Sequence, residues 1–300
     1  MALHKWFCMP EHLSPTSATC FSRCPRRWMY RRMGLESPGL KSAMLFGEAF
    51  HHGASLAAEG RLNEAIAAFD KIWKDEAEDD KRTRSAGHTI LKDFCATHSG
   101  KDALYKLFPP PIGVQVPERV SEWEVPFAID IGIPVPIVGR IDGVGKHRDD
   151  GGTWAIEYKT TSQLGAMFLS NFGFDPQIVT YALALSMNIP QSVEGTIVDG
   201  ILVAKTKVES LRIPIYVSSF MIATCIQWYK DIWNRISACV AAEDFPLNIS
   251  ACSPYPGFGM PGFVCEYQPM CLAGGLWEGM LGLYVHKEPR EFEILNSTPK

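Results

Sequence analysis

Alternation of apolar and polar residues is most regular in the middle of the chain, from Val138 to Thr161. This stretch reads V-G-R-I-D-G-V-G-K-H-R-D-D-G-G-T-W-A-I-E-Y-K-T-T. The alternation stops at residues 149–152 and then resumes, which is typical of two strands joined by a tight glycine turn. With the turn centred between its two aspartates, antiparallel pairing sets Asp142 opposite Glu157, with Cβ atoms about 5 Å apart. The pattern therefore predicts a hairpin carrying two facing carboxylates.

Helical patterning dominates the residues before this hairpin. Ser14-Pro15 supplies an N-cap and a proline at the first helical position, so a short helix is predicted to follow up to residue 34. Apolar residues at helical spacing predict three further helices, at residues 43–60, 61–82 and 86–107.

Strands and helices then mix. Asp175-Pro176 is an N-cap followed by a first-turn proline, and it predicts a helix that runs through Met187. Ser218 or Ser219 caps a long amphipathic helix that reaches about residue 242. Strands are predicted at residues 121–125, 131–146, 153–160, 193–204 and 211–217. Beyond Phe245 the patterning stops in a segment rich in proline, glycine and cysteine.

This order of elements predicts an α/β (α+β) fold, with a mixed central sheet flanked by helices. A single domain over residues 1–300 is expected. It divides into N-terminal helices (11–60), a helical insertion (61–112), a catalytic core (113–245) and a cysteine-rich lobe (246–300).

Composition narrows the class of protein. The chain has 300 residues and 46% hydrophobic residues, enough for a sizeable core. It contains no run of about 18 apolar residues and no apolar N-terminal segment, so neither a transmembrane helix nor a secretory signal is predicted. A cytoplasmic protein without membrane contact is expected.

The formal net charge of −4 means that nucleic-acid binding would rest on a local basic patch. One patch lies between residues 20 and 34, where five arginines and no acidic residue are interleaved with aromatic residues. A solvated basic helix face is one interpretation of this patch. The other is phosphate contacts combined with base stacking, and the residues predicted to bind DNA in this way are Arg23, Arg26, Arg27, Trp28 and Arg31.

The predicted hairpin also offers catalytic chemistry. Period-two geometry places Glu157 and Lys159 on one face of the strand, while Trp154, Ile156 and Tyr158 point to the other. Carboxylate oxygens favour Mg²⁺ or Mn²⁺ over zinc. A bound cation lowers the pKa of a water molecule, and a lysine beside it orients that water or offsets charge on a phosphate. The alternative is a surface ion pair on a polar hairpin, worth less than about 1 kcal/mol.

Four short motifs resemble those of the PD-(D/E)XK nuclease superfamily, specifically its RecB-like branch. G-R-I-D ends at Asp142, and E-Y-K begins at Glu157. Q-I-V-T-Y runs from Gln177 to Tyr181, and G-E-A-F-H ends at His51. On the residues alone His51 and His52 are equally ambiguous, but the resemblance favours His51.

The resemblance implies a restriction-endonuclease-like core and a role for each of these residues. His51, Asp142, Glu157 and the backbone carbonyl of Tyr158 would hold Mg²⁺ or Mn²⁺. Lys159 would assist the nucleophilic water. The remaining catalytic residues are expected to position the substrate or the lysine, and they are Gln177 and Tyr181.

The resemblance extends to the cysteines of RecB-like nucleases that carry an iron–sulfur cluster, including AddB-type subunits and some CRISPR-associated nucleases. It implies a [4Fe–4S] cluster held by Cys24, Cys252, Cys265 and Cys271. Cys20 competes with Cys24, but the C-P-R-R-W setting favours Cys24. The twelve residues between Cys252 and Cys265 exceed the gap in many relatives. A structural Zn²⁺ on the same thiolates, or four unrelated buried thiols, are the alternatives.

The resemblance thus implies a metal-dependent DNA nuclease, expected to be an exonuclease on DNA ends or single strands. A phage-encoded recombination enzyme in the host cytoplasm fits this expectation. The chain has no G-x-x-x-x-G-K-[ST] motif, so a helicase or recombination partner would be a separate chain. Two rivals remain: a non-catalytic DNA-binding adaptor that keeps the fold, and a trimming endonuclease of the kind that acts in CRISPR adaptation.

Overall fold

The computed structural model describes residues 8–38, 42–74, 79–99, 105–107, 125–147, 151–189, 192–204, 209–252 and 265–287. The chain forms two compact units, each built from separated stretches of sequence. Unit 1 comprises residues 1–39, 130–138 and 226–294, and unit 2 comprises residues 40–129, 139–225 and 295–300.

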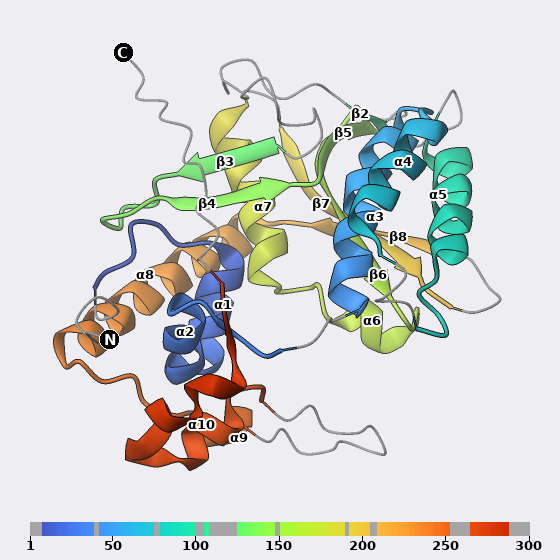
Figure 1. Ribbon diagram of the computed structural model, residues 1–300. Helices are drawn as coiled ribbons and strands as arrows, with labels where there is room; N and C mark the ends of the chain where they lie inside the picture. Colours follow the sequence, from blue (N-terminus) through green and yellow to red (C-terminus); the bar gives the residue numbers. More distant parts are fainter. Residues whose placement is uncertain are drawn as a thin grey trace. The chain divides into compact units, whose positions relative to one another are not determined.

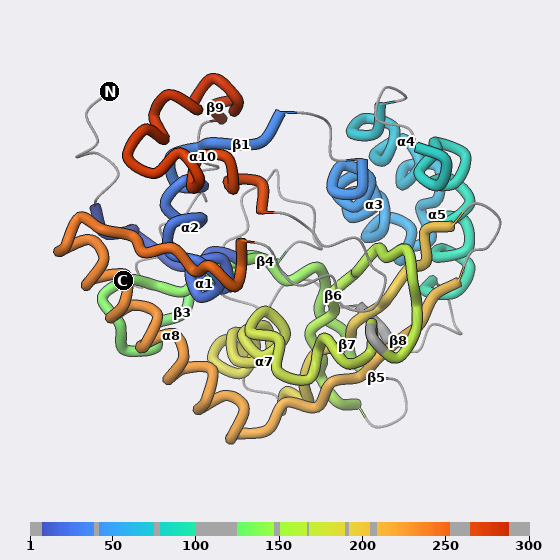
Figure 2. The backbone as a smooth tube through the Cα atoms, turned by 90° about the horizontal axis from the view of Figure 1, so that it is seen from below, coloured from blue at the N-terminus to red at the C-terminus, as the bar shows by residue number. Residues whose placement is uncertain are grey.

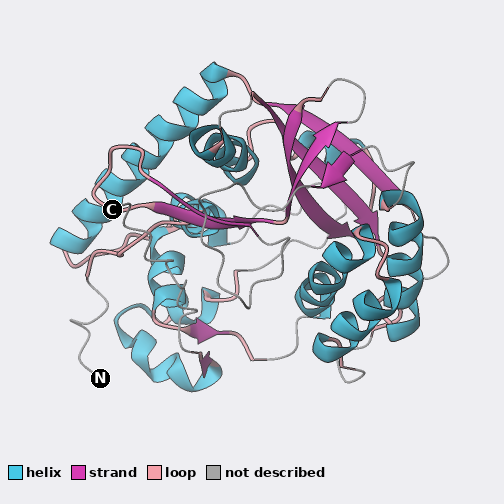
Figure 3. Ribbon diagram, turned by 90° about the horizontal axis from the view of Figure 1, so that it is seen from above, coloured by secondary structure: helices cyan, strands magenta, loops and turns pink. Residues whose placement is uncertain are grey.

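Unit 2 is built on a five-stranded mixed sheet, drawn in magenta with its covering helices in Figure 3. The strand order is β2-β5-β6-β7-β8. The central pair β6–β7 is parallel, and the other neighbours are antiparallel. The strands are β2 (Tyr105–Leu107), β5 (Gly143–His147), β6 (Thr153–Thr161), β7 (Val193–Leu202) and β8 (Ser210–Tyr216). A parallel pair needs a long crossover, and residues 162–192 supply it.

The predicted hairpin register is confirmed. β5 pairs with β6 so that Gly143 faces Ile156 and Lys146 faces Thr153. Asp142 and Glu157 would be the next residue pair in this register, just beyond the last paired residues of β5 and β6. The two acidic residues therefore lie at the sheet end where β5 begins.

Helices cover both faces of this sheet (Figure 1). Helices α3 (Ser42–Ala58), α4 (Leu62–Ile72) and α5 (Arg84–His98) form one layer, and their apolar side chains bury Ile156 and Tyr158 of β6. Helix α7 (Pro176–Asn188) packs against β6 and β7. Ile178 of α7 joins Val198 of β7 and Phe172 in a second apolar cluster. One face of β6 is therefore covered by α3–α5 and the other by α7.

Local sequence explains where the site elements begin. The Asp175 side chain accepts a 2.7 Å hydrogen bond from the Gln177 amide, so α7 begins with the predicted cap and proline. The short helix α6 (Ala166–Ser170) precedes it. The two-stranded sheet of β3 (Val125–Ile129) and β4 (Ile137–Ile141) leads directly into Asp142 and β5.

Unit 1 brings together described segments from the N-terminal and C-terminal parts of the sequence (Figure 2). Strand β1 (Leu35–Glu36) pairs antiparallel with β9 (Val285–His286). The unit also contains α1 (Pro15–Arg23), α2 (Pro25–Arg32), α9 (Ile249–Cys252), α10 (Gln268–Leu272) and the 3-10 helix η3 (Gly274–Leu283). Helix α8 (Ser219–Ala241) belongs to unit 1 from residue 226 onward. Within the described ranges, no helix is both long and apolar enough to cross a lipid bilayer.

Several predicted elements differ from the observed ones. The helix expected up to residue 34 is two helices, because Cys24 adopts an extended conformation and Pro25 starts α2. The helix expected at residues 86–107 ends at His98, and β2 follows, because Ser99-Gly100 is a chain-breaking pair. The strand expected at residues 121–125 lies mostly outside the described residues. The segment after Phe245 contains short helices where no pattern was seen.

The fold class is confirmed. A central mixed sheet flanked by helices gives the mixed α/β architecture of a restriction-endonuclease-like core. The division of residues 1–300 into four functional segments of one domain stays a prediction.

Candidate active site

Asp142 lies in the single-residue break between β4 and β5. Its Oδ2 accepts a 2.8 Å hydrogen bond from the backbone amide of Tyr158 on β6. The G-R-I-D motif requires glycine at position 139 for a steric reason, because a Cβ at Gly139 would come within 2.6 Å of the Phe127 ring on β3. The motif thus combines close strand packing with a carboxylate fixed at the end of the sheet.

Glu157 and Lys159 share one face of β6, as the period of two predicts. Glu157 is 2% exposed and forms an ion pair through Oε1 with the Lys159 ammonium. Gln177 of α7 bridges the pair: its Oε1 accepts from Lys159 Nζ at 3.0 Å, and its Nε2 donates to Glu157 Oε1 at 3.1 Å. The same Nε2 donates to the Tyr181 hydroxyl at 2.7 Å. Helix α7 therefore fixes the positions of both charged side chains.

His51 approaches Asp142 from α3, with its Nδ1 3.3 Å from Asp142 Oδ2. The glycine one turn earlier, Gly47, permits this approach, because a Cβ there would lie 3.2 Å from Thr160 Oγ1 on β6. His52 is exposed instead. The structure thus brings His51 to the two acidic residues and turns His52 away from them.

The electrostatics of the histidine and Asp142 are coupled. Burial alone would raise the pKa of Asp142, but the charge of His51 and the hydrogen bonds from His51 and Tyr158 hold it below its usual value. Burial lowers the pKa of His51, but the carboxylates of Asp142 and Glu157 outweigh that effect and raise it to about 9. The imidazole is therefore protonated at neutral pH.

Glu157 and Lys159 form the second charged pair. Burial and the charge of Asp142 raise the pKa of Glu157 to about 7, despite the opposing charges of Lys159 and His51. Burial would lower the pKa of Lys159, but Glu157 raises it above its usual value. Lys159 is therefore held as an ammonium group.

The donor set fits a hard divalent cation. Glu157 Oε2 is buried and has no hydrogen-bond partner, and Asp142 adds a second carboxylate at the same sheet end. Among the described residues, no group of three or more His, Cys, Asp or Glu side chains is already arranged to hold a metal ion. In this arrangement the two carboxylates are instead paired with the cationic side chains of His51 and Lys159.

Comparison with known proteins decides the family. The model of the PD-(D/E)XK nuclease superfamily matches residues 12–271, which is most of the chain. The chain belongs to the PD-(D/E)XK nuclease superfamily. Membership indicates a metal-dependent nuclease, and the nuclease fold implies DNA as its substrate.

Other comparisons add little. No curated protein matches the chain. Among solved structures, the crystal structure of SSO0001 is similar, with 15% sequence identity, coverage of 77% of this chain and 82% of that one, and a TM-score of 0.33. Such a low TM-score supports no conclusion about this chain. The catalytic and metal-binding roles of individual residues in this superfamily member therefore stay predictions.

The four cysteines expected to hold a cluster lie within electrostatic range of one another in unit 1. Burial raises the pKa of Cys271 to about 11, and the neighbouring thiols of Cys252, Cys265 and Cys24 add to the rise. The Cys265 amide donates to the Cys252 carbonyl at 3.1 Å. Burial raises the pKa of Cys20, and the charge of Arg31 opposes that rise, so the choice between Cys20 and Cys24 stays a prediction. All four are free thiols.

The arginine–aromatic patch is largely engaged within unit 1. Arg26 donates to the Phe245 carbonyl at 2.5 Å, and Arg27 and Arg31 lie 3.3 and 3.9 Å from Glu266. Trp28 is 2% exposed, and its Nε1 donates to Ser17 at 2.8 Å. The burial of Trp28 leaves no ring face open for the base stacking expected of it. Arg23 is exposed, and a phosphate contact there stays a prediction.

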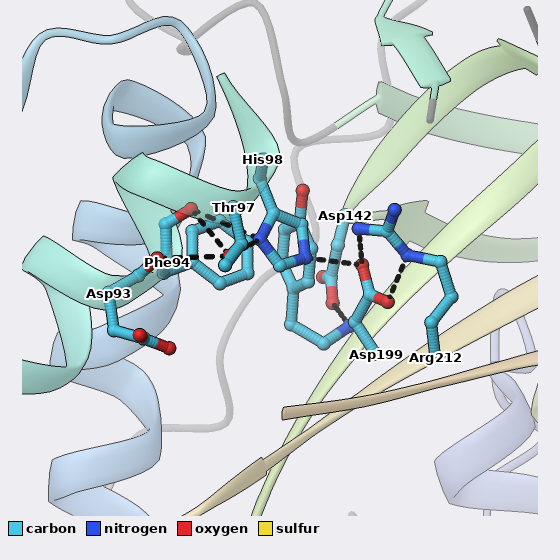
Figure 4. Close-up of polar contacts among 8 residues, drawn as sticks. Asp93, Phe94, Thr97, His98, Asp142, Asp199 and Arg212 are labelled. Atoms are coloured by element: carbon cyan, nitrogen blue, oxygen red, sulfur yellow. Dashed lines mark hydrogen bonds and ion pairs between the residues drawn. The ribbon is translucent and has the colours of Figure 1, made fainter. Parts of the chain in front are cut away.

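The structure also contains a charged network that sequence analysis missed (Figure 4). Asp199, next to Tyr158 across the β6–β7 ladder, accepts hydrogen bonds of 2.7 and 3.0 Å from Arg212 of β8. His98 Nε2 lies 3.2 Å from Asp199 Oδ2, and its ring stacks on Phe94. This network joins the end of α5 to two strands of the sheet. No motif signals it, because His98 comes from a helix far away in the sequence from the adjacent strands β7 and β8 that carry Asp199 and Arg212.

Proposed function

We propose that the chain is a RecB-like DNA nuclease that degrades DNA from its ends or as a single strand. The observation that supports this most directly is the convergence of His51, Asp142, Glu157, Lys159 and Gln177 at one end of the sheet. A non-catalytic adaptor has no need for this complete set.

In this proposal the residues act as follows. Lys159, kept as an ammonium group by Glu157, donates a hydrogen bond to the attacking water and offsets charge on the scissile phosphate. Gln177 accepts a hydrogen bond from Lys159 and so keeps the lysine side chain in this position. Tyr181, 5% exposed and packed edge-on against Phe127, holds Gln177 in turn. The three residues form a positioning chain from α7 to the reacting phosphate.

Asp142, Glu157, His51 and the Tyr158 carbonyl would hold Mg²⁺ or Mn²⁺. When bound, such an ion lowers the pKa of a water molecule and neutralises charge on the phosphate. The buried, unpartnered Glu157 Oε2 supports this assignment.

Metal binding near neutral pH should release more than one proton per ion, because a histidine ligates only as the neutral base and Glu157, whose pKa is raised to about 7, ligates as a carboxylate. In the metal-free protein His51 is protonated, with its pKa raised to about 9 by Asp142 and Glu157 against the effect of burial. Affinity for Mn²⁺ should therefore increase as the pH rises toward that value. Calorimetric titration in two buffers of different ionisation enthalpy measures the proton release.

His51→Gln should bind Mn²⁺ more weakly and release fewer protons. The matched control is His52→Gln, one position away and exposed, which should behave as the wild type. Equal heats in both buffers would contradict a protonated ligand at this site.

The mode of digestion is tested with linear and circular single strands. An exonuclease leaves circular DNA intact and shortens a linear strand from one end, so 5′ and 3′ labels report the polarity. Degradation of circles in Mn²⁺ would instead support the rival endonuclease.

A [4Fe–4S] cluster on Cys24, Cys252, Cys265 and Cys271 is part of the proposal, supported by the electrostatic interactions of the Cys271 thiol with the other three thiols. Anaerobically purified protein should be brown, with broad visible absorbance. Stoichiometric zinc without iron would favour the structural Zn²⁺ instead.

The proposal also includes a cytoplasmic location and a helicase or recombination partner on a separate chain. Co-purification of such a partner with the tagged protein would test it.

A further inference from the structure

The segment between β6 and α7 is tethered at both ends to the candidate active site. Lys159 lies three residues before its start at 162 and Gln177 two residues after its end at 175, and the side chains of these two residues are hydrogen bonded at 3.0 Å. The two ends of the segment are therefore held together at the candidate site. Residues close to either end lie near the site.

The three phenylalanines in this loop differ in how far their rings are exposed to solvent. Phe168 and Phe172 pack edge-to-face with ring centroids 4.9 Å apart, in the cluster with Ile178 and Val198. Phe174 is 63% exposed. The two packed rings anchor the loop, so the exposed ring is presented on a fixed support.

The backbone around Phe174 is also defined. The Asp175 amide donates to the Phe172 carbonyl at 3.4 Å, and the Asp175 carboxylate caps α7. Gln177 is three positions after Phe174, so their Cα atoms lie at most about 11 Å apart. A base stacked on Phe174 would therefore lie within a few nucleotides of the candidate active site.

We propose that Phe174 stacks on an unpaired base of the DNA strand, within a few nucleotides of the scissile phosphate. This inference rests on the proposed nuclease function and adds to it a preference for single-stranded DNA at the site. Aromatic rings are the usual platforms for unpaired bases, and stacking tolerates any sequence because every base has a π-face. Trp28, the aromatic residue expected to stack, is buried and cannot serve.

A single exposed apolar residue is normal on protein surfaces, and it needs a further reason to be assigned a role. Here the reason is position: the ring sits at the base of a loop closed by two candidate catalytic residues. Two phenylalanines of the segment are packed in the apolar cluster and anchor it, and the third is exposed to solvent.

The inference is tested by binding of a labelled linear single strand in EDTA, so that the strand stays uncut. Phe174→Ala should weaken binding about 5- to 150-fold, which is the range for one lost base–aromatic stack. Phe174→Trp should restore binding, whereas Phe174→Leu, apolar without a π-face, should not. Equal affinity of the alanine variant and the wild type would overturn the inference, as would wild-type protein that fails to bind the strand.

Tyr216→Ala is the matched control. Tyr216 is 67% exposed and packs against Trp154, which lies on the sheet face opposite Glu157 and Lys159. Truncating this equally exposed aromatic residue should leave DNA affinity unchanged. A loss equal to that of Phe174→Ala would mean that any exposed aromatic ring matters, and it would overturn the assignment.

A spectroscopic signature separates stacking from a structural effect. The fluorescence of 2-aminopurine is quenched by stacking, so wild-type protein should quench the probe at one position of the strand, and Phe174→Ala should not. An abasic site at that position should weaken binding of the wild type but not weaken the variant further. Quenching that persists in the variant would exclude Phe174 as the stacking partner.

The two hypotheses fail in different ways. Cleavage in Mn²⁺ without any dependence of binding on Phe174 overturns the stacking inference and leaves the nuclease proposal intact. Binding and quenching that depend on Phe174, without cleavage, support the stacking and overturn the nuclease proposal.

Discussion

Asp142→Asn should lower the metal-dependent cleavage of linear DNA at least about a thousandfold. The substitution removes the negative charge that a divalent cation needs, while the amide oxygen can still accept the hydrogen bond from the Tyr158 amide. The side chain keeps its size at the break between β4 and β5. The variant should therefore fold and bind DNA in EDTA but fail to cut it, as measured by release of end label in Mn²⁺.

Lys159→Ala should lose cleavage as well, because it removes the ammonium group that pairs with Glu157 Oε1 and is proposed to orient the attacking water. The control is Asp231→Asn, an exposed aspartate on α8 whose partner is Gln227, and this variant should cut at the wild-type rate. Persistence of cleavage in both site variants would mean that these residues do not catalyse. Absence of cleavage by the wild-type protein in Mn²⁺ would instead support the non-catalytic adaptor.

The hairpin could be predicted from sequence because its register depends only on local spacing. Two alternating segments around one glycine turn leave a single register that keeps both apolar faces buried, and Gly143 indeed faces Ile156. The positions of Glu157 and Lys159 on one face follow from the same period. Local geometry thus determined much of the candidate site in advance.

The third candidate ligand could not be chosen in this way. His51 and His52 are neighbours on α3, about 100° apart around the helix, and both border an apolar stripe. Which of them meets Asp142 depends on how closely α3 approaches β6, which Gly47 permits. Periodicity within one helix contains no information about that packing.

Tertiary packing also explains the misinterpreted aromatic residue. Trp28 lies among arginines in the sequence, as a base-stacking residue would. In the structure its ring is enclosed by Phe21, Phe245 and the Arg32 guanidinium. Phe245 comes from the far end of the sequence. Phe174 was overlooked for the opposite reason, since it lies in a loop without periodicity and its exposure depends on which neighbouring rings pack.

Cys265→Ser combined with Cys271→Ser should destabilise the protein, lowering its melting temperature by about 10 °C or more, and not merely reduce turnover. The proposed cluster would join residue 24 to residues 252–271, and a link that closes so long a loop removes much entropy from the unfolded chain. Without a metal, burial and the neighbouring thiols raise the pKa of Cys271 to about 11, so this thiol would stay protonated.

The expected loss is partial because other contacts join the same segments. Tyr30 packs against Tyr267, and the Tyr267 hydroxyl donates to the Leu35 carbonyl at 2.6 Å. The double variant should therefore still fold at low temperature but lose its iron and visible absorbance. Thermal melting followed by circular dichroism, with an iron assay, measures both effects.

The matched control exchanges two half-buried cysteines outside the proposed cluster, Cys95→Ser with Cys239→Ser. It makes the same chemical change at similar burial, so it should keep both the iron and the melting temperature. A normal melting transition in the Cys265/Cys271 variant would contradict a stabilising cluster. If the control variant is destabilised equally, the effect comes from the loss of buried thiols in general and not from the cluster. A drop confined to the first variant, together with the loss of iron, is the result that a cluster joining the two ends of the chain requires.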